Sequence, residues 1–177
     1  MDEETQIRHR RSIRLKNFDY TQPASYFVTI SAHNQKCLFG EIIFGVMKYS
    51  LVGRLVNECW LEIPRHFPNV ALPRHMIMPN HLHGIIVLRG RMPGVDERRK
   101  PAKVEGFSKP VVGSIGTIVR SFKSAVSKRA REMSGRPQMQ VWQRNYYEHV
   151  IRNKDDFRKT VEYICRNPER WGKDKHS

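Results

Sequence analysis

Acidic residues, long apolar runs and paired cysteines are all scarce in this sequence. The 177 residues include 17 Asp and Glu against 32 Lys and Arg, which leaves a formal net charge of +15. Such a surplus is far from the balance of a typical metabolic enzyme and predicts a polyanionic partner. Charge alone does not separate DNA from RNA or from an anionic membrane, because all three attract Lys and Arg in the same way.

The missing apolar and cysteine patterns exclude further classes of protein. No apolar run approaches the roughly 20 residues that span a bilayer, and the N-terminus lacks the apolar stretch of a secretory signal. We therefore expect a soluble, cytoplasmic protein. The three cysteines, Cys37, Cys59 and Cys165, are odd in number and widely spaced, which argues against a disulfide framework or a zinc ribbon. Cys59 is expected to pack in the core.

The length fits one domain with a single active site. We expect that domain to span residues 22–177. Residues 1–21 are polar and rich in arginine, which is typical of a flexible basic arm, and a solvated tail is an equal alternative. Residues 89–110 combine Gly, Pro and charge without periodicity, which predicts a mobile basic loop.

Hydrophobic periodicity predicts strands and helices in a simple order. Strands are expected at 26–32, 71–78, 81–88 and 140–151, with a small hairpin around Gly45. Helices are expected after Ser50 and ending before Pro64, at 113–133, and from Asn153 to near Asn167, where Pro168 disfavours continuation. The order β-α-β-β-α-β, with an added C-terminal helix, predicts an α+β fold with a ferredoxin-like antiparallel sheet.

Basic residues gather on the second long helix and near the chain's C-terminal third. Their number against so few acids favours phosphate contact for the set, although a solvated helix face is the alternative for any one of them. The candidates are Arg120, Lys123, Lys128, Arg129, Arg131, Arg144, Arg152 and Arg166.

Two histidines and a tyrosine carry the candidate chemistry. His81 and His83 are two apart on a predicted strand, so both imidazoles leave one face and could bind a divalent ion. Taken alone, a packed or exposed histidine pair is the more common outcome. Tyr163 and Asn167 are four apart on one helical face and could supply a nucleophile and a ligand oxygen. A core tyrosine and a helix-capping asparagine are the alternative from spacing alone.

Other residues near the C-terminal helix could take the same roles. Tyr146 and Tyr147 compete as nucleophiles, although aromatic residues in a strand usually serve packing. Glu148 and His149 are more often structural, and His149 could also reach a phosphate.

Four segments together resemble a known family. The segments MPNHLHGIIV (78–87), GSIGTIVRSFKSAVSKRARE (113–132), VWQRNYYEHVIRN (141–153) and VEYICRNPERW (161–171) resemble the REP-associated tyrosine transposases, which are HUH single-strand transposases with one catalytic tyrosine. The resemblance runs over roughly residues 24–172, in order. It is much more specific than the histidine pair alone.

The resemblance implies a function and a site. His81 and His83 match the family's histidine pair, Tyr163 matches its nucleophile, and Asn167 matches its third metal ligand. It implies a transposase that uses Mg²⁺ or Mn²⁺, recognises hairpins in single-stranded DNA and cleaves beside them through a 5′-phosphotyrosine. Such a protein would associate with the nucleoid when bound to DNA, as a monomer or a homodimer. The rivals are a non-catalytic single-stranded nucleic-acid-binding module and a metallophosphoesterase that uses activated water.

Overall fold

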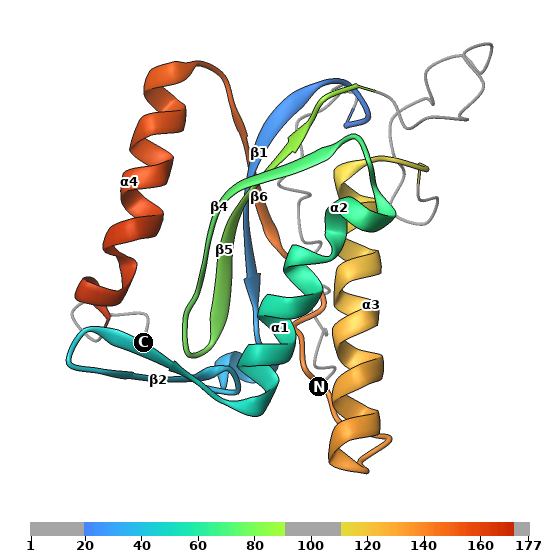
Figure 1. Cartoon of the computed structure of the whole chain (residues 1–177), viewed down its shortest axis with the longest axis vertical. Coiled ribbons are helices and arrows are strands. Elements are labelled where there is room, and N and C mark those ends of the chain that lie inside the picture. The colour runs from blue at the N-terminus through green and yellow to red at the C-terminus, as the bar shows by residue number, and fades with distance from the viewer. Residues whose placement is uncertain (1–19, 91–110, 172–177) are drawn as a thin grey trace, which may run out of the picture.

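A four-stranded antiparallel sheet organises the chain in the computed structural model, which describes residues 20–90 and 111–171 (Figure 1). Its strands are β1 (Ala24–Ser31), β4 (Val70–Ile77), β5 (His81–Leu88) and β6 (Tyr147–Ile151), in the spatial order β4-β5-β1-β6. Helices α1 (Leu51–Leu61) and α3 (Ile115–Ser134) connect strands, and α4 (Lys154–Arg170) follows the last one. The predicted α+β, ferredoxin-like order β-α-β-β-α-β with an added helix is therefore confirmed.

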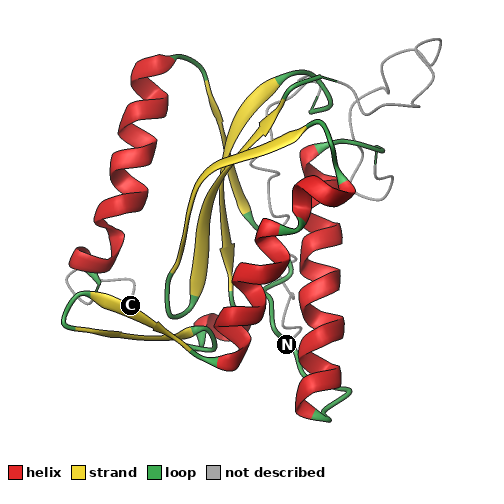
Figure 2. Cartoon of the chain, in the orientation of Figure 1, coloured by secondary structure: helices red, strands yellow, loops and turns green. Residues whose placement is uncertain are grey.

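The helices cover the two faces of the sheet unequally. Helices α1 and α3 lie on one face and pack against each other, whereas α4 lies alone on the opposite face (Figure 2). Each helix begins at a side chain that accepts a backbone hydrogen bond, as expected for N-caps: Ser50 for α1, Ser114 for α3 and Asn153 for α4. The sheet therefore has two buried faces with different partners.

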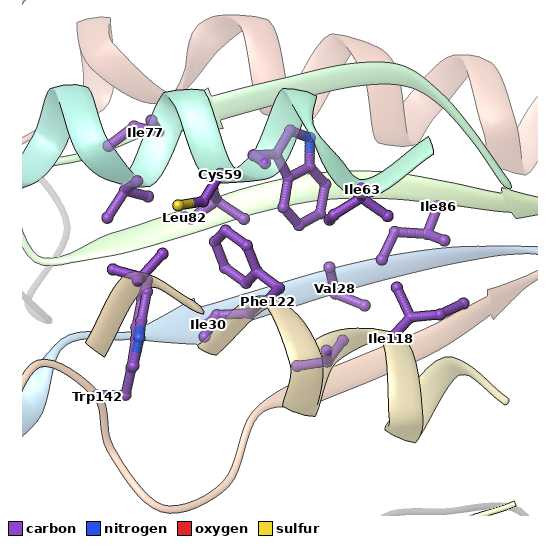
Figure 3. Close-up of a cluster of buried hydrophobic side chains, with 14 of the residues drawn as sticks. Val28, Ile30, Cys59, Ile63, Ile77, Leu82, Ile86, Ile118, Phe122 and Trp142 are labelled. Carbon is purple, nitrogen blue, oxygen red and sulfur yellow. The ribbon is translucent and has the colours of Figure 1, made fainter. Parts of the chain in front are cut away.

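The larger core lies between the sheet and the pair α1 and α3 (Figure 3). Alternate residues of β1 and β5, among them Ile30 and Leu82, point into it and are fully buried. Trp60 of α1 is also fully buried and lies directly over Gly84, where a Cβ atom would collide with the indole ring. Cys59 is buried, as predicted.

The smaller core lies beneath α4. It is built from Phe27, Ile85, Ile151 and Ile164, with Phe157 and Val161 packed against it. The apolar face of α4 therefore packs against the sheet.

A separate hairpin stands outside the main sheet. Strands β2 (Gly40–Ile43) and β3 (Val46–Tyr49) pair with each other only, as the sequence predicts. Phe44 and Gly45 at its turn both have positive φ, at 50° and 75°, which is the requirement of a tight two-residue hairpin turn. A short 3-10 helix, η1 (His33–Gln35), precedes the hairpin.

Two predicted boundaries were wrong, and one short helix was not predicted. Helix α4 continues through Pro168 to Arg170, since Pro168 lies in the last turn and its missing N–H removes only one late hydrogen bond. The strand expected at 140–151 is regular only from Tyr147, because Trp142 forms just an isolated bridge to Ala32. A short helix, α2 (Ile63–His66), follows α1, with Pro64 in its first turn, where proline is tolerated.

Parts of two predicted segments lie outside the described residues. These are the basic arm at 1–21, of which only residues 20 and 21 are described, and the basic loop at 89–110, of which only residues 89 and 90 are described. Over the described ranges, no helix is long and apolar enough to cross a membrane.

Candidate functional site

His81 and His83 converge at the start of β5, on the face that α4 covers. Leu82 between them points into the larger core, so strand alternation sends both imidazoles the other way. Their Nε2 atoms lie 2.9 Å apart, and the ring centroids lie 4.4 Å apart. The pair therefore presents its Nε2 atoms at one point.

The Nδ1 atom of each imidazole lies within hydrogen-bond distance of a neighbouring side-chain oxygen. His81 Nδ1 lies 2.6 Å from Asn80 Oδ1, and His83 Nδ1 lies 2.9 Å from Thr29 Oγ1. An oxygen at Nδ1 fixes the ring orientation and leaves Nε2 as the outward atom, which is the usual arrangement around metal-binding histidines.

The turn that carries the first histidine is fixed to the rest of the fold. Asn80 is only 5% exposed, and its carbonyl accepts a hydrogen bond from Ala32 N–H at 2.8 Å. The Pro79 carbonyl accepts from Phe39 N–H at 2.9 Å. The tight turn at Pro79-Asn80 therefore positions His81.

Burial keeps both histidines neutral. It lowers the pKa of His81 to about 4 and the pKa of His83 to about 3, and the neighbouring His81 adds to the effect on His83. Neutral imidazoles have the lone pairs that metal binding requires.

Helix α4 brings Tyr163 and Asn167 to the histidines. The Tyr163 ring centroid lies 5.3 Å from that of His83. The Asn167 amide donates to the Tyr163 carbonyl at 3.1 Å, and its side chain lies close enough to His83 to act on the pKa of that imidazole. Tyr163 is 45% exposed, so it is not the core residue of the alternative interpretation. Asn167 lies inside α4 and does not cap it. The structure therefore brings together all four residues that the sequence singled out for chemistry.

The possible ligand set is narrow. No group of three His, Cys, Asp or Glu side chains that could hold a metal occurs in the part of the chain that the structure describes. A metal held here would therefore have two imidazole nitrogens and an amide oxygen, such as that of Asn167, as its protein ligands. This donor set is compatible with a hard divalent ion that keeps several waters.

The candidate basic residues fall on both faces of the sheet. Those on α3 lie in the layer opposite α4, and several are engaged within the protein. Lys123 Nζ donates to the carbonyls of Gln143 and Arg144 at 2.5 and 3.2 Å, and Arg129 pairs with Glu62 at 2.7 Å. Arg120 is exposed on the same helix.

Other contacts within the protein hold three of the remaining basic side chains. They join Lys128 to Glu132 at 4.0 Å, Arg131 to the Met139 carbonyl at 3.1 Å, and Arg166 to Glu162 at 2.8 Å. Arg144 and Arg152 are exposed at the two ends of the β6 segment. The set is thus dispersed, and no single face collects all of it.

The competing residues near β6 separate by face. Tyr146 packs against the larger core, whereas Tyr147 is exposed on the α4 side. His149 Nε2 lies 3.1 Å from Asp156 Oδ2, within hydrogen-bond distance, which agrees with a structural role.

Sequence reasoning missed several neighbours of the site. These are Thr29, Asn80, Phe27, which stacks on His83 with centroids 5.4 Å apart, and Trp171, whose ring lies 6.1 Å from that of His81. Asn80 could have been found from its position beside His81 in a turn. Thr29 and Phe27 could not, because only the pairing of β1 with β5 brings them to the histidines.

Comparison with known proteins gives one close relative. No protein-family model matches the sequence. An uncharacterized protein of Haemophilus influenzae is 43% identical over 171 residues, which cover 95% of this chain and 93% of that protein. The chain belongs to the same family as this Haemophilus influenzae protein.

Solved structures give a similarity of fold. A REP-associated tyrosine transposase bound to a REP hairpin is similar with a TM-score of 0.57 at 20% identity, covering 92% of this chain and 76% of that chain. At this identity the likeness concerns the fold alone. This chain and the transposase share the fold in which helices pack on an antiparallel sheet.

Proposed function

We propose that this protein is a transposase that cuts and rejoins single-stranded DNA beside a hairpin, with Tyr163 as the nucleophile. The observation that carries the proposal is that Tyr163 and Asn167 of α4 lie beside His81 and His83, which are about 80 residues earlier in the chain. An exposed phenol beside two neutral imidazoles is an arrangement suited to attack on a phosphodiester.

The chemical step is the one that the resemblance to REP-associated tyrosine transposases implies. The Tyr163 oxygen attacks the phosphorus, a new O–P bond forms, and the bond from phosphorus to the 3′ oxygen breaks. The phenolic proton passes to water, and the departing 3′ oxygen takes up a proton from water and becomes a 3′-hydroxyl. The result is a 5′-phosphotyrosine that a later 3′-hydroxyl attacks in the reverse sense, which rejoins strands without an external energy source.

His81, His83 and Asn167 are the residues that would hold a Mg²⁺ or Mn²⁺ ion. The fit rests on the convergence of the Nε2 atoms, the neutrality of both rings and the Asn167 contact with His83. When bound, the ion would act as a Lewis acid that neutralises charge on the phosphate and favours the phenolate over a phenol of pKa about 10.

Single-stranded DNA with a hairpin is the proposed partner. A net charge of +15 supports a nucleic acid, and the structural neighbour of similar fold is a transposase bound to a REP hairpin. Tyr163 is exposed, so its hydroxyl is accessible to a strand of DNA. A monomer and a homodimer both remain compatible with the proposal.

The test is covalent capture on labelled hairpin oligonucleotides taken from repeats near the gene. Wild-type protein, Tyr163→Phe and the matched control Tyr147→Phe are incubated with magnesium, manganese or a chelator and run on denaturing gels. We expect labelled adduct from wild type and from Tyr147→Phe with metal only. Tyr163→Phe should give none while binding DNA within about two-fold of wild type, since only a hydroxyl is lost.

The other outcomes separate the rivals. Cleavage without an adduct would favour metal-activated water as the nucleophile. Binding without cleavage by any of the proteins would favour the non-catalytic module. Full activity of His81→Ala or His83→Ala in the presence of a chelator would contradict the role assigned to the metal.

A further inference from the structure

We propose that Tyr147 stacks on an unpaired nucleobase of the DNA, next to the phosphate that Tyr163 attacks. The inference rests on the proposed function for its substrate, and it adds a base-binding position to that site. Tyr147 is not needed as a second nucleophile in this assignment.

The register of the sheet places Tyr147 in line with the histidine pair. His83 on β5 pairs with Thr29 on β1, and Thr29 pairs with Tyr147 on β6. Directly paired residues send their side chains to the same face, here the α4 face. Because neighbouring strands lie about 4.8 Å apart, the Tyr147 backbone is roughly 10 Å from that of His83. That separation puts the ring beside the reactive position without crowding it.

Phe27 links the two tyrosines into one aromatic surface. Its ring centroid lies 6.4 Å from that of Tyr147 at 68° and 5.9 Å from that of Tyr163 at 88°. Phe27 itself is only 9% exposed, whereas Tyr147 is 46% exposed. The buried ring thus supports two exposed ones, with Tyr163 on α4 and Tyr147 on the edge strand β6. An exposed, supported aromatic ring beside a reactive group is a surface on which a base can stack.

The segment that leads to Tyr147 is anchored and basic. Lys123 reaches from α3 to donate hydrogen bonds to the carbonyls of Gln143 and Arg144, which fixes the chain just before β6. Arg144 is exposed three residues before Tyr147. An exposed cation a few residues from an exposed aromatic ring suits a phosphate next to a base, so charge favours a nucleotide over an apolar peptide as the occupant.

The experiment measures stacking directly, in a protein that cannot cleave. Tyr163→Phe protein is mixed with magnesium and hairpin oligonucleotides that carry 2-aminopurine at each unpaired position in turn. We expect the fluorescence to fall on binding at one position beside the scissile phosphate. The decrease should remain when Tyr147→Phe is added and disappear with Tyr147→Ala or Tyr147→Leu, because leucine keeps apolar bulk without a π face.

Affinity gives the second measurement. Tyr147→Ala should raise Kd about ten-fold, a typical consequence of losing one stacked base. When Tyr147 is intact, an abasic site at the same position should raise Kd by the same factor as Tyr147→Ala does. On that abasic DNA, Tyr147→Ala should cause no further increase. Thermal melting of each variant shows that the edge strand still folds.

The outcomes distinguish this inference from the proposed function. An equal loss on intact and abasic DNA, or no loss at all, would overturn the stacking role while Tyr163 capture stood. Loss of the covalent adduct in Tyr147→Phe would make Tyr147 the nucleophile and overturn the assignment. Failure of wild-type protein to bind any single-stranded hairpin would overturn both proposals.

Discussion

Thr29 and His83 face each other across β1 and β5, and the Thr29 hydroxyl lies 2.9 Å from His83 Nδ1. The hydroxyl thereby orients the imidazole whose Nε2 points at His81. A group that holds a ligand in this way usually tunes metal affinity without touching the metal.

Replacing that hydroxyl is the first prediction. Thr29→Val keeps the shape and strand preference of the side chain, so the fold should hold, but manganese affinity should fall by about 10- to 100-fold. Thr29→Ser restores a hydroxyl and should bind nearly as well as wild type. Manganese titration followed by electron paramagnetic resonance measures the affinity without any DNA. Equal affinity of the valine and serine variants would remove the positioning role.

The second prediction concerns the path of the strand. Arg144 is exposed three residues before Tyr147, whereas Arg120 is exposed on α3, in the layer opposite α4. For a short single strand without a hairpin, Arg144→Ala should lower the slope of log affinity against log salt by about 0.7, the value for one phosphate contact. Arg120→Ala should leave that slope unchanged. A change of slope for Arg120→Ala that occurs only with a longer hairpin substrate would show that α3 binds the hairpin. A change with the short strand would contradict the assigned path.

Lys123 gives a prediction for stability against pH. Burial lowers the pKa of Lys123 from its ordinary 10.5 to about 8, so between these values the unfolded chain binds more protons than the folded one. The free energy of unfolding contributed by this residue therefore rises with pH from about 8 to 10.5, and the cost of burying the charge is fully present below pH 8. Because the amine keeps some access to water, we expect a rise of about 1 to 2 kcal/mol.

Two variants on α3 isolate that effect. The unfolding free energy of wild type minus that of Lys123→Met, measured in urea titrations, should increase between pH 7 and pH 9.5. The same difference for Lys128→Met should stay flat, because Lys128 is an exposed lysine on the same helix. A flat or falling difference for Lys123→Met would show that its two carbonyl hydrogen bonds offset the burial.

Gly84 gives the last prediction. A methyl group there would collide with the Trp60 indole, so Gly84→Ala should destabilise the protein by about 1 to 3 kcal/mol, the usual cost of overpacking. Trp60→Phe shortens the ring that blocks the position. In urea unfolding of the double-mutant cycle, Gly84→Ala should therefore cost less in the Trp60→Phe background. An equal cost in both backgrounds would point to a backbone effect instead of the contact.

The sequence by itself determined the elements and much of the site. Alternation fixed the shared face of His81 and His83, and the helical repeat fixed the shared face of Tyr163 and Asn167, because both periods are properties of the local backbone. The order of strands and helices was enough for the fold class. Helix capping at Ser50 and Asn153 was equally readable, since the cap and the N–H that it accepts from are three residues apart.

Only the tertiary structure decided which residues of distant strands and helices contact one another across the sheet. The β1–β5–β6 register puts Thr29 behind His83 and Tyr147 in the same row, and no local pattern encodes a register between distant strands. Packing also placed α4 on the face opposite α3, which separates the basic helix from the histidines. These outcomes depend on contacts between residues far apart in the chain. The lowest free energy is set by the burial and pairing of whole elements, not by the preference of any one segment.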